Sequence, residues 1–248
     1  NRKNEILADA AERAAVTADW LGGAPYPREK INRSWVRVLA NQMHDILPGT
    51  SIARAYTFSW NDELVGLNGF ASVLNDSVGA IVRAMDTRVR GVPLVVYNPL
   101  CITREDVVEA GVSYEDRAPS TVTVYDPQGS PVPTQILESR EHELRIAFVA
   151  KTPPLSWSVY DVQPAQGTVR DDPSLRVGQR RLENEHYVVN IDDNGDVASI
   201  VDKDAGGREM LAAPARLVFT REKPQNWPAW NMDWYDRQKA PMDAVSGP

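Results

Sequence analysis

The sequence predicts a multi-domain protein of mixed α and β class, in which an N-terminal three-helix bundle is followed by an antiparallel β-sandwich. Apolar residues recur at helical spacing up to about Met85. From about Gly91 they alternate over short segments that are separated by polar turns, as in strands. No helical pattern lies between these segments, and this favours antiparallel sheets.

Three helices account for the N-terminal part. The first is expected at residues 4–21, where a Gly-Gly pair ends it. The second begins at Pro27, a residue suited to a first helical turn, and ends at Pro48-Gly49. The third is expected from about Asp62 to Met85, with Asn61 or Asp62 as its cap. Short connections between them predict a bundle over residues 1–90.

Short strands account for the rest of the chain. Residues 91–165 are expected to form a first β subregion, and residues 180–248 the start of a larger, truncated C-terminal β-sandwich. Residues 163–179, rich in Pro, Gly, Asp and Gln, are the expected connector. The strand candidates are residues 92–97, 106–112, 120–125, 132–137, 144–150, 156–162, 187–191, 197–201 and 215–220.

Composition excludes several kinds of partner. The chain has 34 acidic and 27 basic side chains and a formal charge of −7, with no cluster of Lys and Arg, so no nucleic-acid partner is expected. No run approaches the roughly 20 apolar residues of a membrane span, so no membrane partner is expected. A lone cysteine, Cys101, rules out an internal disulfide. A neutral or weakly charged ligand fits this balance best.

The ends of the sequence suggest a piece of a longer polypeptide. It begins at Asn1 without a methionine, inside an expected helix, and stops at Pro248 with no closing element. Any targeting signal would then lie outside the chain. A cytoplasmic location is the expectation.

An adjacent pair, His44 and Asp45, is the most informative feature for function. It is expected at the end of the second helix. An imidazole can bind a divalent metal and a carboxylate can hold a hydroxyl group, but a catalytic zinc site usually has three protein ligands. The other histidines, His142 and His186, lie in strand-like segments far along the chain. The alternative is a helix-terminal imidazole that bonds the last carbonyls of its own helix.

Several separate segments, in order, resemble the α-mannosidases of glycoside hydrolase family 38. The resemblance covers the middle and early C-terminal portions of that family and runs nearly from end to end of the chain. The segments are NQMHDILPGTSI at residues 41–52, Asn98-Pro99-Leu100, YDPQGSPVPTQ at residues 125–135, residues 182–211, and PQNWPAWNMD at residues 224–233.

The resemblance implies a zinc-dependent, retaining hydrolase of terminal α-mannosides. The helical middle domain of that family contributes one histidine from a His-Asp-x-x-x-Gly-Thr/Ser segment, which this sequence matches from His44 to Thr50. By resemblance, His44 would be a zinc ligand and Asp45 would contact a hydroxyl of the bound mannose.

The resemblance also implies what the chain lacks. An N-terminal catalytic domain, absent here, would supply the remaining zinc ligands and both catalytic carboxylates. No catalytic residue is therefore assigned, and zinc is expected in the full-length parent but not in this fragment. The expected partners are an α-mannoside glycan and the parent's own N-terminal catalytic domain, and the fragment alone is expected to hydrolyse nothing.

Two other functions compete with this one. One is a non-catalytic β-sandwich module that binds carbohydrate or has a structural role. The other is a metal phosphohydrolase of the His-Asp type, which requires a further upstream histidine and helices throughout. No histidine precedes His44 and the pattern turns to strands after Gly91, so the phosphohydrolase is disfavoured.

The aromatic residues have a structural interpretation. Trp227, Trp230 and Trp234 could stack on sugar rings, but packing that pins a loop to a sheet is favoured. The N-terminal tryptophans are expected in the bundle core or between bundle and sheet, namely Trp20, Trp35 and Trp60.

Overall fold

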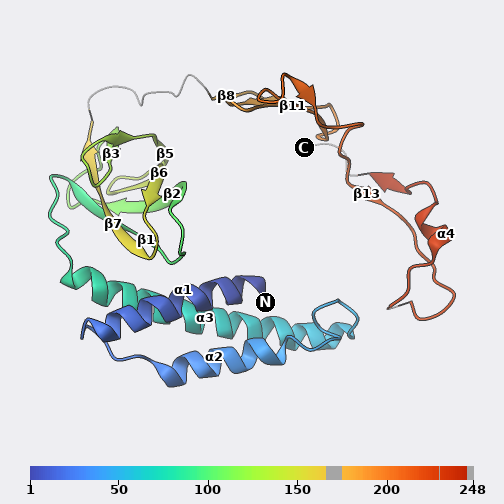
Figure 1. Cartoon of the computed structure of the whole chain (residues 1–248), viewed down its shortest axis with the longest axis horizontal. Helices are drawn as coiled ribbons and strands as arrows, with labels where there is room; N and C mark the ends of the chain where they lie inside the picture. Colours follow the sequence, from blue (N-terminus) through green and yellow to red (C-terminus); the bar gives the residue numbers. More distant parts are fainter. Residues whose placement is uncertain (166–174, 229, 245–248) are drawn as a thin grey trace. The chain divides into compact units, whose positions relative to one another are not determined.

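The computed structural model describes residues 1–165, 175–228 and 230–244. The chain forms two compact units, Asn1–Arg170 and Asp171–Pro248. Among the described residues, the first unit contains three helices and seven strands, and the second contains the remaining strands and one short helix (Figure 1).

The first unit begins with the predicted three-helix bundle. Its helices are α1 (Arg2–Trp20), α2 (Arg28–Ala40) and α3 (Ala53–Ala84), which lie side by side in Figure 1. Small side chains make the contact faces: α1 buries six alanines, and α3 buries Gly66 and Ser77 beside Phe70. Trp35 of α2 meets the edge of Phe70 at a ring-centroid distance of 5.4 Å. Close approach of helix backbones therefore forms much of this core.

Two helix boundaries differ from the prediction. α2 ends at Ala40, well before Pro48-Gly49, and α3 begins at Ala53 instead of Asp62. The expected caps, Asn61 and Asp62, lie inside α3, whose N-cap is Ile52 with no side-chain hydrogen bond. Residues 53–60 contain neither Gly nor Pro, so nothing in them stops the helix from extending toward its N-terminus.

Because the helices pack through small residues, several large apolar side chains stay exposed to solvent. Ile6, Leu39 and Leu64, expected in the apolar stripes, are each more than half exposed. Trp20 and Trp60, expected in the core or at its edge, are 84% and 73% exposed, so that expectation was wrong for both. Alanine and glycine carry too weak an apolar signal to reveal which face of a helix is buried.

The longest helix, α3, is also the most apolar. An 18-residue window has a mean hydropathy of 1.2, and 33% of that window is buried. By length and composition α3 could cross a membrane. A single helix of this kind is weak evidence for a span, because core helices of bundles share both properties.

A two-sheet antiparallel sandwich follows the bundle, as predicted. The first sheet has the order β1-β7-β3-β4 and the second has the order β2-β6-β5. Leu144, Ile146 and Phe148 of β6 face Tyr160 and Val162 of β7 across a common core. The strands of the first sheet are β1 (Val92–Asn98), β3 (Val122–Tyr125), β4 (Pro131–Val132) and β7 (Ser156–Pro164). Those of the second are β2 (Arg104–Ser113), β5 (Thr134–Ser139) and β6 (Glu143–Thr152).

One aromatic pair joins the sandwich to the bundle. Trp157 of β7 stacks on Tyr97 of β1 with ring centroids 4.5 Å apart. Trp157 also packs against a buried cluster formed by Ala18 of α1 with Ala80 and Ile81 of α3. Burial raises the pKa of Tyr97 to about 12, so its hydroxyl stays protonated at neutral pH. The two parts of the first unit thus share apolar contacts.

The second unit contains a five-stranded antiparallel sheet of order β12-β11-β10-β9-β8. Its predicted hairpin turn at Asp192–Gly195 is confirmed, with Gly195 at φ +84° between β10 and β11. The predicted connector falls largely on residues 166–174, which lie outside the described residues. The sheet's strands are β8 (Arg176–Val177), β9 (Arg181–Glu183), β10 (Tyr187–Ile191), β11 (Val197–Asp202) and β12 (Arg208–Glu209).

The end of the second unit has less regular structure. β13 (Val218–Phe219) pairs with β14 (Asp243–Ala244), so the strand predicted at residues 215–220 is shorter than expected. Between these two strands lies a short helix, α4 (Trp234–Arg237).

Candidate functional site

His44 and Asp45 lie in the loop between α2 and α3. The prediction that they end a helix is wrong, because α2 stops at Ala40 and Asn41 caps it. The Asn41 side chain donates a 2.9 Å hydrogen bond to the carbonyl of Arg37, which satisfies one of the last carbonyls of the helix. His44 is therefore not needed as a cap.

The start of the loop is tied to α1. The Gln42 side chain donates to Oε1 of Glu5 at 3.1 Å. Asn41 is only 3% exposed, and its backbone carbonyl accepts a hydrogen bond from the side-chain amide of Asn1 at 3.4 Å. These contacts fix where the chain leaves α2 and so limit the positions open to His44.

Asp45 is held from two sides. The Thr50 hydroxyl lies 3.2 Å from Oδ1 of Asp45, and the Tyr56 hydroxyl donates to the Asp45 carbonyl at 3.1 Å. The same Tyr56 oxygen accepts the N–H of Ser51 at 3.0 Å. Gly49, at φ +87°, lets the chain turn back between them. Sequence reasoning missed Tyr56, because the third helix was expected to begin after it.

The His44 ring points to solvent. Its side chain is 83% exposed and that of Asp45 is 36% exposed, with His44 Nε2 at 3.5 Å from Asp45 Oδ2. The surrounding loop and the start of α3 carry several exposed apolar side chains. These are Met43, Leu47, Ile52, Phe58 and Trp60. An exposed apolar surface around a polar pair is typical of a binding region.

His44 and Asp45 are residue types that bind zinc, but two ligands are too few for a zinc site. An imidazole nitrogen and a carboxylate oxygen are both zinc ligands, and four ligands complete a tetrahedral site. In the part of the chain that the structure describes, no group of three or more His, Cys, Asp or Glu could hold a metal ion. The remaining ligands would have to come from groups outside that part.

The other two histidines have separate environments. His142 lies beside β6, where its Nδ1 is 3.0 Å from the carbonyl of Asp116. His186 lies in the turn before β10, with Nδ1 at 2.7 Å from Oδ2 of Asp204. Asp204 raises the pKa of His186, chiefly through this hydrogen bond. Neither histidine joins a metal-binding cluster within the described residues.

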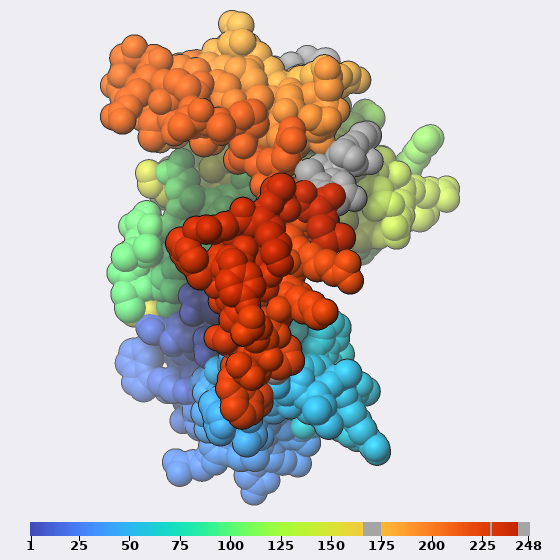
Figure 2. All heavy atoms as spheres, turned by 90° about the vertical axis from the view of Figure 1, so that its right-hand side faces the viewer, coloured from blue at the N-terminus to red at the C-terminus, as the bar shows by residue number. Residues whose placement is uncertain are grey.

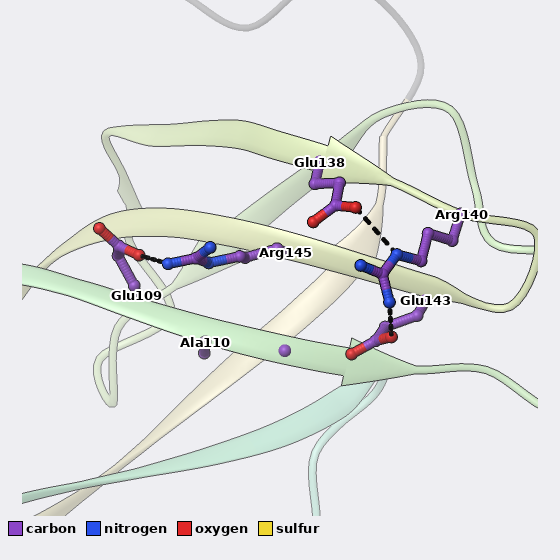
Figure 3. Close-up of a pocket in the computed structure, with 7 residues that line it drawn as sticks. Glu109, Ala110, Glu138, Arg140, Glu143 and Arg145 are labelled. Carbon is purple, nitrogen blue, oxygen red and sulfur yellow. Dashed lines mark hydrogen bonds and ion pairs between the residues drawn. The ribbon is translucent and has the colours of Figure 1, made fainter.

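A polar hollow of about 360 Å³ on the second sheet of the sandwich is a weaker candidate. Figure 3 shows Arg140 between Glu138 and Glu143, at 2.9 and 3.8 Å, and Arg145 against Glu109. Every charged side chain that lines the hollow thus has an opposite charge beside it. Exposed pairs of this kind contribute little to stability, and here the charged groups of the hollow bind one another.

The tryptophans of the second unit do not pin a loop to a sheet, so the favoured structural interpretation was wrong. Trp227, Trp230 and Trp234 are 70%, 67% and 69% exposed. The segment holds its shape through polar contacts instead, among them the bond from Gln225 N to Asp233 Oδ2 at 2.9 Å.

Comparisons with known proteins agree with this architecture. The model of the alpha mannosidase middle domain matches residues 1–80, and that of the glycosyl hydrolases family 38 C-terminal domain matches residues 182–246. The search of curated proteins finds no match.

Two solved structures from Enterococcus faecalis share the fold. One is described as an alpha-mannosidase, with a TM-score of 0.67 and 19% identity over 88% of this chain and 29% of that one. The other is described as a protein in glycosyl hydrolase family 38, with a TM-score of 0.69 and 19% identity over 88% of this chain and 30% of that one. The chain thus spans less than a third of each. The two domain matches, in this order, show that the chain belongs to glycosyl hydrolase family 38.

Proposed function

We propose that the chain is the middle and C-terminal portion of a zinc-dependent, retaining α-mannosidase that hydrolyses terminal α-mannosides of glycans. The observation that carries the proposal is the exposed, fixed His44–Asp45 pair inside the matched middle domain. A family 38 C-terminal match later in the chain, and similarity to a structure described as an alpha-mannosidase, support it.

In this proposal the two loop residues have different roles. His44 offers an imidazole nitrogen as one zinc ligand, and its solvent-facing ring leaves room for ligands from another domain. Asp45, fixed by Thr50 and Tyr56, accepts a hydrogen bond from a hydroxyl of the mannose ring. Bound zinc would act as a Lewis acid toward sugar hydroxyls.

The catalytic carboxylates are not assigned to this chain. Retaining hydrolysis uses two carboxyl groups about 5 Å apart, one as nucleophile and one as acid and base. We propose that both come from an N-terminal domain, against which the apolar surface around His44 packs. The 248-residue chain alone is then expected to be inactive.

Hydrolysis of an aryl α-mannoside tests this function. The polypeptide translated from the complete reading frame should hydrolyse it, and the 248-residue chain should not. In the active polypeptide, Asp45→Asn should lower kcat/KM by about tenfold or more, because a hydrogen bond to a charged acceptor is lost.

The matched control is Asp116→Asn, which changes an exposed acid outside the loop and should leave kcat/KM unchanged. Hydrolysis by the 248-residue chain alone would refute the proposal that both catalytic carboxylates come from an N-terminal domain. Equal activity of the Asp45 and Asp116 variants would refute the role of Asp45.

A further inference from the structure

Asn4 and Glu63 form a buried polar contact between α1 and α3. The Asn4 side chain donates to Oε2 of Glu63 at 2.5 Å and to the Glu63 carbonyl at 2.9 Å. The backbone nitrogen of Asn1 lies 3.1 Å from the same Oε2. Asn4 is 2% exposed and the Glu63 side chain is 16% exposed, so the contact is largely closed to solvent.

Stability does not explain this polar contact. Oδ1 of Asn4 and Oε1 of Glu63 are buried and have no hydrogen-bond partner among the described residues. A buried acceptor without a donor costs free energy, so an apolar pair in the same place would be as stable or more stable. Buried polar contacts between helices have another known role, which is to fix one register between the helices at some cost in stability.

The helix faces around this contact define their register only weakly. Every buried residue of α1 other than Asn4 is an alanine, and on α3 a Cβ added to Gly66 would lie 3.6 Å from Asn4 Oδ1. Small side chains form shallow ridges, which do little to stop one helix from sliding along another. A slip by one helical turn would move α1 by about 5.4 Å. The hydrogen bonds of Asn4 exclude such a slip, because they reach Glu63 in only one register.

Both anchors of the loop between α2 and α3 lie next to this contact in the sequence of their helices. The next residue of α1, Glu5, accepts the Gln42 side chain at 3.1 Å. About two helical turns before Glu63 on α3, Tyr56 donates to the Asp45 carbonyl at 3.1 Å. In Figure 1 the start of α1, the loop and the start of α3 lie at the same end of the bundle, which is the end that Figure 2 turns toward the viewer. The register of α1 on α3 therefore sets the distance between the two anchors.

We propose that Asn4 and Glu63 are positioning residues, which fix the register of α1 on α3 and thereby set where His44 and Asp45 lie. Their effect on hydrolysis rests on the proposed function, whereas the register does not. A misplacement of about 1 Å in a catalytic site costs up to about 100-fold in rate. A slipped register would displace the start of the loop by more than that.

The double variant Asn4→Leu with Glu63→Leu tests the inference, because it replaces the polar contact with an apolar one. In the complete polypeptide it should resist urea at least as well as the wild type, but kcat/KM for an aryl α-mannoside should fall by about tenfold or more. Glu63→Gln should keep the wild-type kcat/KM, because its amide oxygen still accepts from Asn4. Ser77→Ala is the matched control: it removes a hydroxyl of α3 from a residue that is 4% exposed and should change neither measurement.

NMR of the 248-residue chain reports on the register without any hydrolysis. The wild type should show contacts of the Glu5 side chain with Gln42 and of the Tyr56 ring with Asp45, and the double variant should weaken one set or both. Asn4→Ala extends the alanine face of α1 and should have the same effect, so it serves as the test if the double variant does not fold.

The outcomes separate this inference from the proposed function. Variants that keep both sets of NMR contacts would overturn the inference, whether or not they lose activity, because the register would then not depend on Asn4 and Glu63. A loss of activity that only follows a loss of stability would overturn it as well, by assigning the two residues a purely structural role. A complete polypeptide that hydrolyses no α-mannoside would refute the proposed function, and the NMR contacts would still decide whether the polar contact fixes the register.

Discussion

At the residue scale, one hydroxyl group holds the loop that carries His44 and Asp45. Tyr56 OH donates to the Asp45 carbonyl and accepts the N–H of Ser51. Tyr56→Phe removes both bonds and keeps the ring, so we expect a loss of about 1–2 kcal/mol in the free energy of unfolding. Urea denaturation would measure it, and a variant as stable as the wild type would show that the hydroxyl does not fix the loop.

A second residue-scale prediction concerns His186. Its hydrogen bond to Asp204, together with the charges of Asp204, Glu185 and Asp202, raises its pKa above 6.5. Because the folded-state pKa exceeds the unfolded value, the stabilisation is complete below about pH 6.5 and is lost as the pH rises through the folded-state pKa.

Asp204→Asn should move the pKa of His186 back toward 6.5, measured by NMR of the imidazole. Glu185→Gln is the control and should shift it less, since the Glu185 charge is a smaller contribution. If the Asp204 variant kept the raised pKa, the assigned cause would be wrong.

The segment from His44 to Thr50 made His44 and Asp45 visible from sequence, because it matches the His-Asp-x-x-x-Gly-Thr/Ser pattern. An adjacent carboxylate alone would not have done so, since Glu141 and Glu143 flank His142 and Glu185 precedes His186. The role of Tyr56 in holding the loop could not be predicted from the sequence. Its role depends on a loop that turns back at Gly49 and on a helix that begins at Ala53, and neither boundary has a strong local signal.

At the element scale, β1 begins at a point of close backbone contact. A Cβ on Gly91 would lie 2.1 Å from the Val162 carbonyl oxygen of β7, and Asp161 Oδ1 accepts the N–H of Gly91 at 2.8 Å. Gly91→Ala must push β1 away from β7, so we expect a loss of about 2–3 kcal/mol in stability.

Chemical denaturation followed by circular dichroism would measure this loss. Gly79→Ala is the control, because inside α3 a Cβ would meet only Nη1 of Arg83 at 3.4 Å. It should be neutral or stabilise the chain by up to about 1 kcal/mol. Equal stability of the two variants would contradict the close contact at β1.

The strands were predictable as elements because their alternation is strong. β6, for example, buries Leu144, Ile146, Phe148 and Ala150 in strict alternation. The helix faces were harder to predict. The side of α1 that packs in the bundle is made of alanines, whereas the larger Ile6 and Leu21 are exposed.

At the scale of the whole molecule, the sequence predicted the class correctly, a helical bundle followed by antiparallel sheets. It did so because the change from helical spacing to alternation near Gly91 is a property of the whole chain and not of one segment. The exposure of Trp20, Trp60 and the tryptophans at residues 227–234 could not be predicted, because large aromatic side chains are usually buried.

The central claim is that this chain supplies one ligand to a metal site completed by another domain. The zinc content of the purified complete polypeptide tests it most directly. Wild type and His142→Ala, which changes a histidine in the sandwich, should each hold one zinc ion, whereas His44→Ala should hold far less. Full zinc occupancy in His44→Ala would contradict the claim.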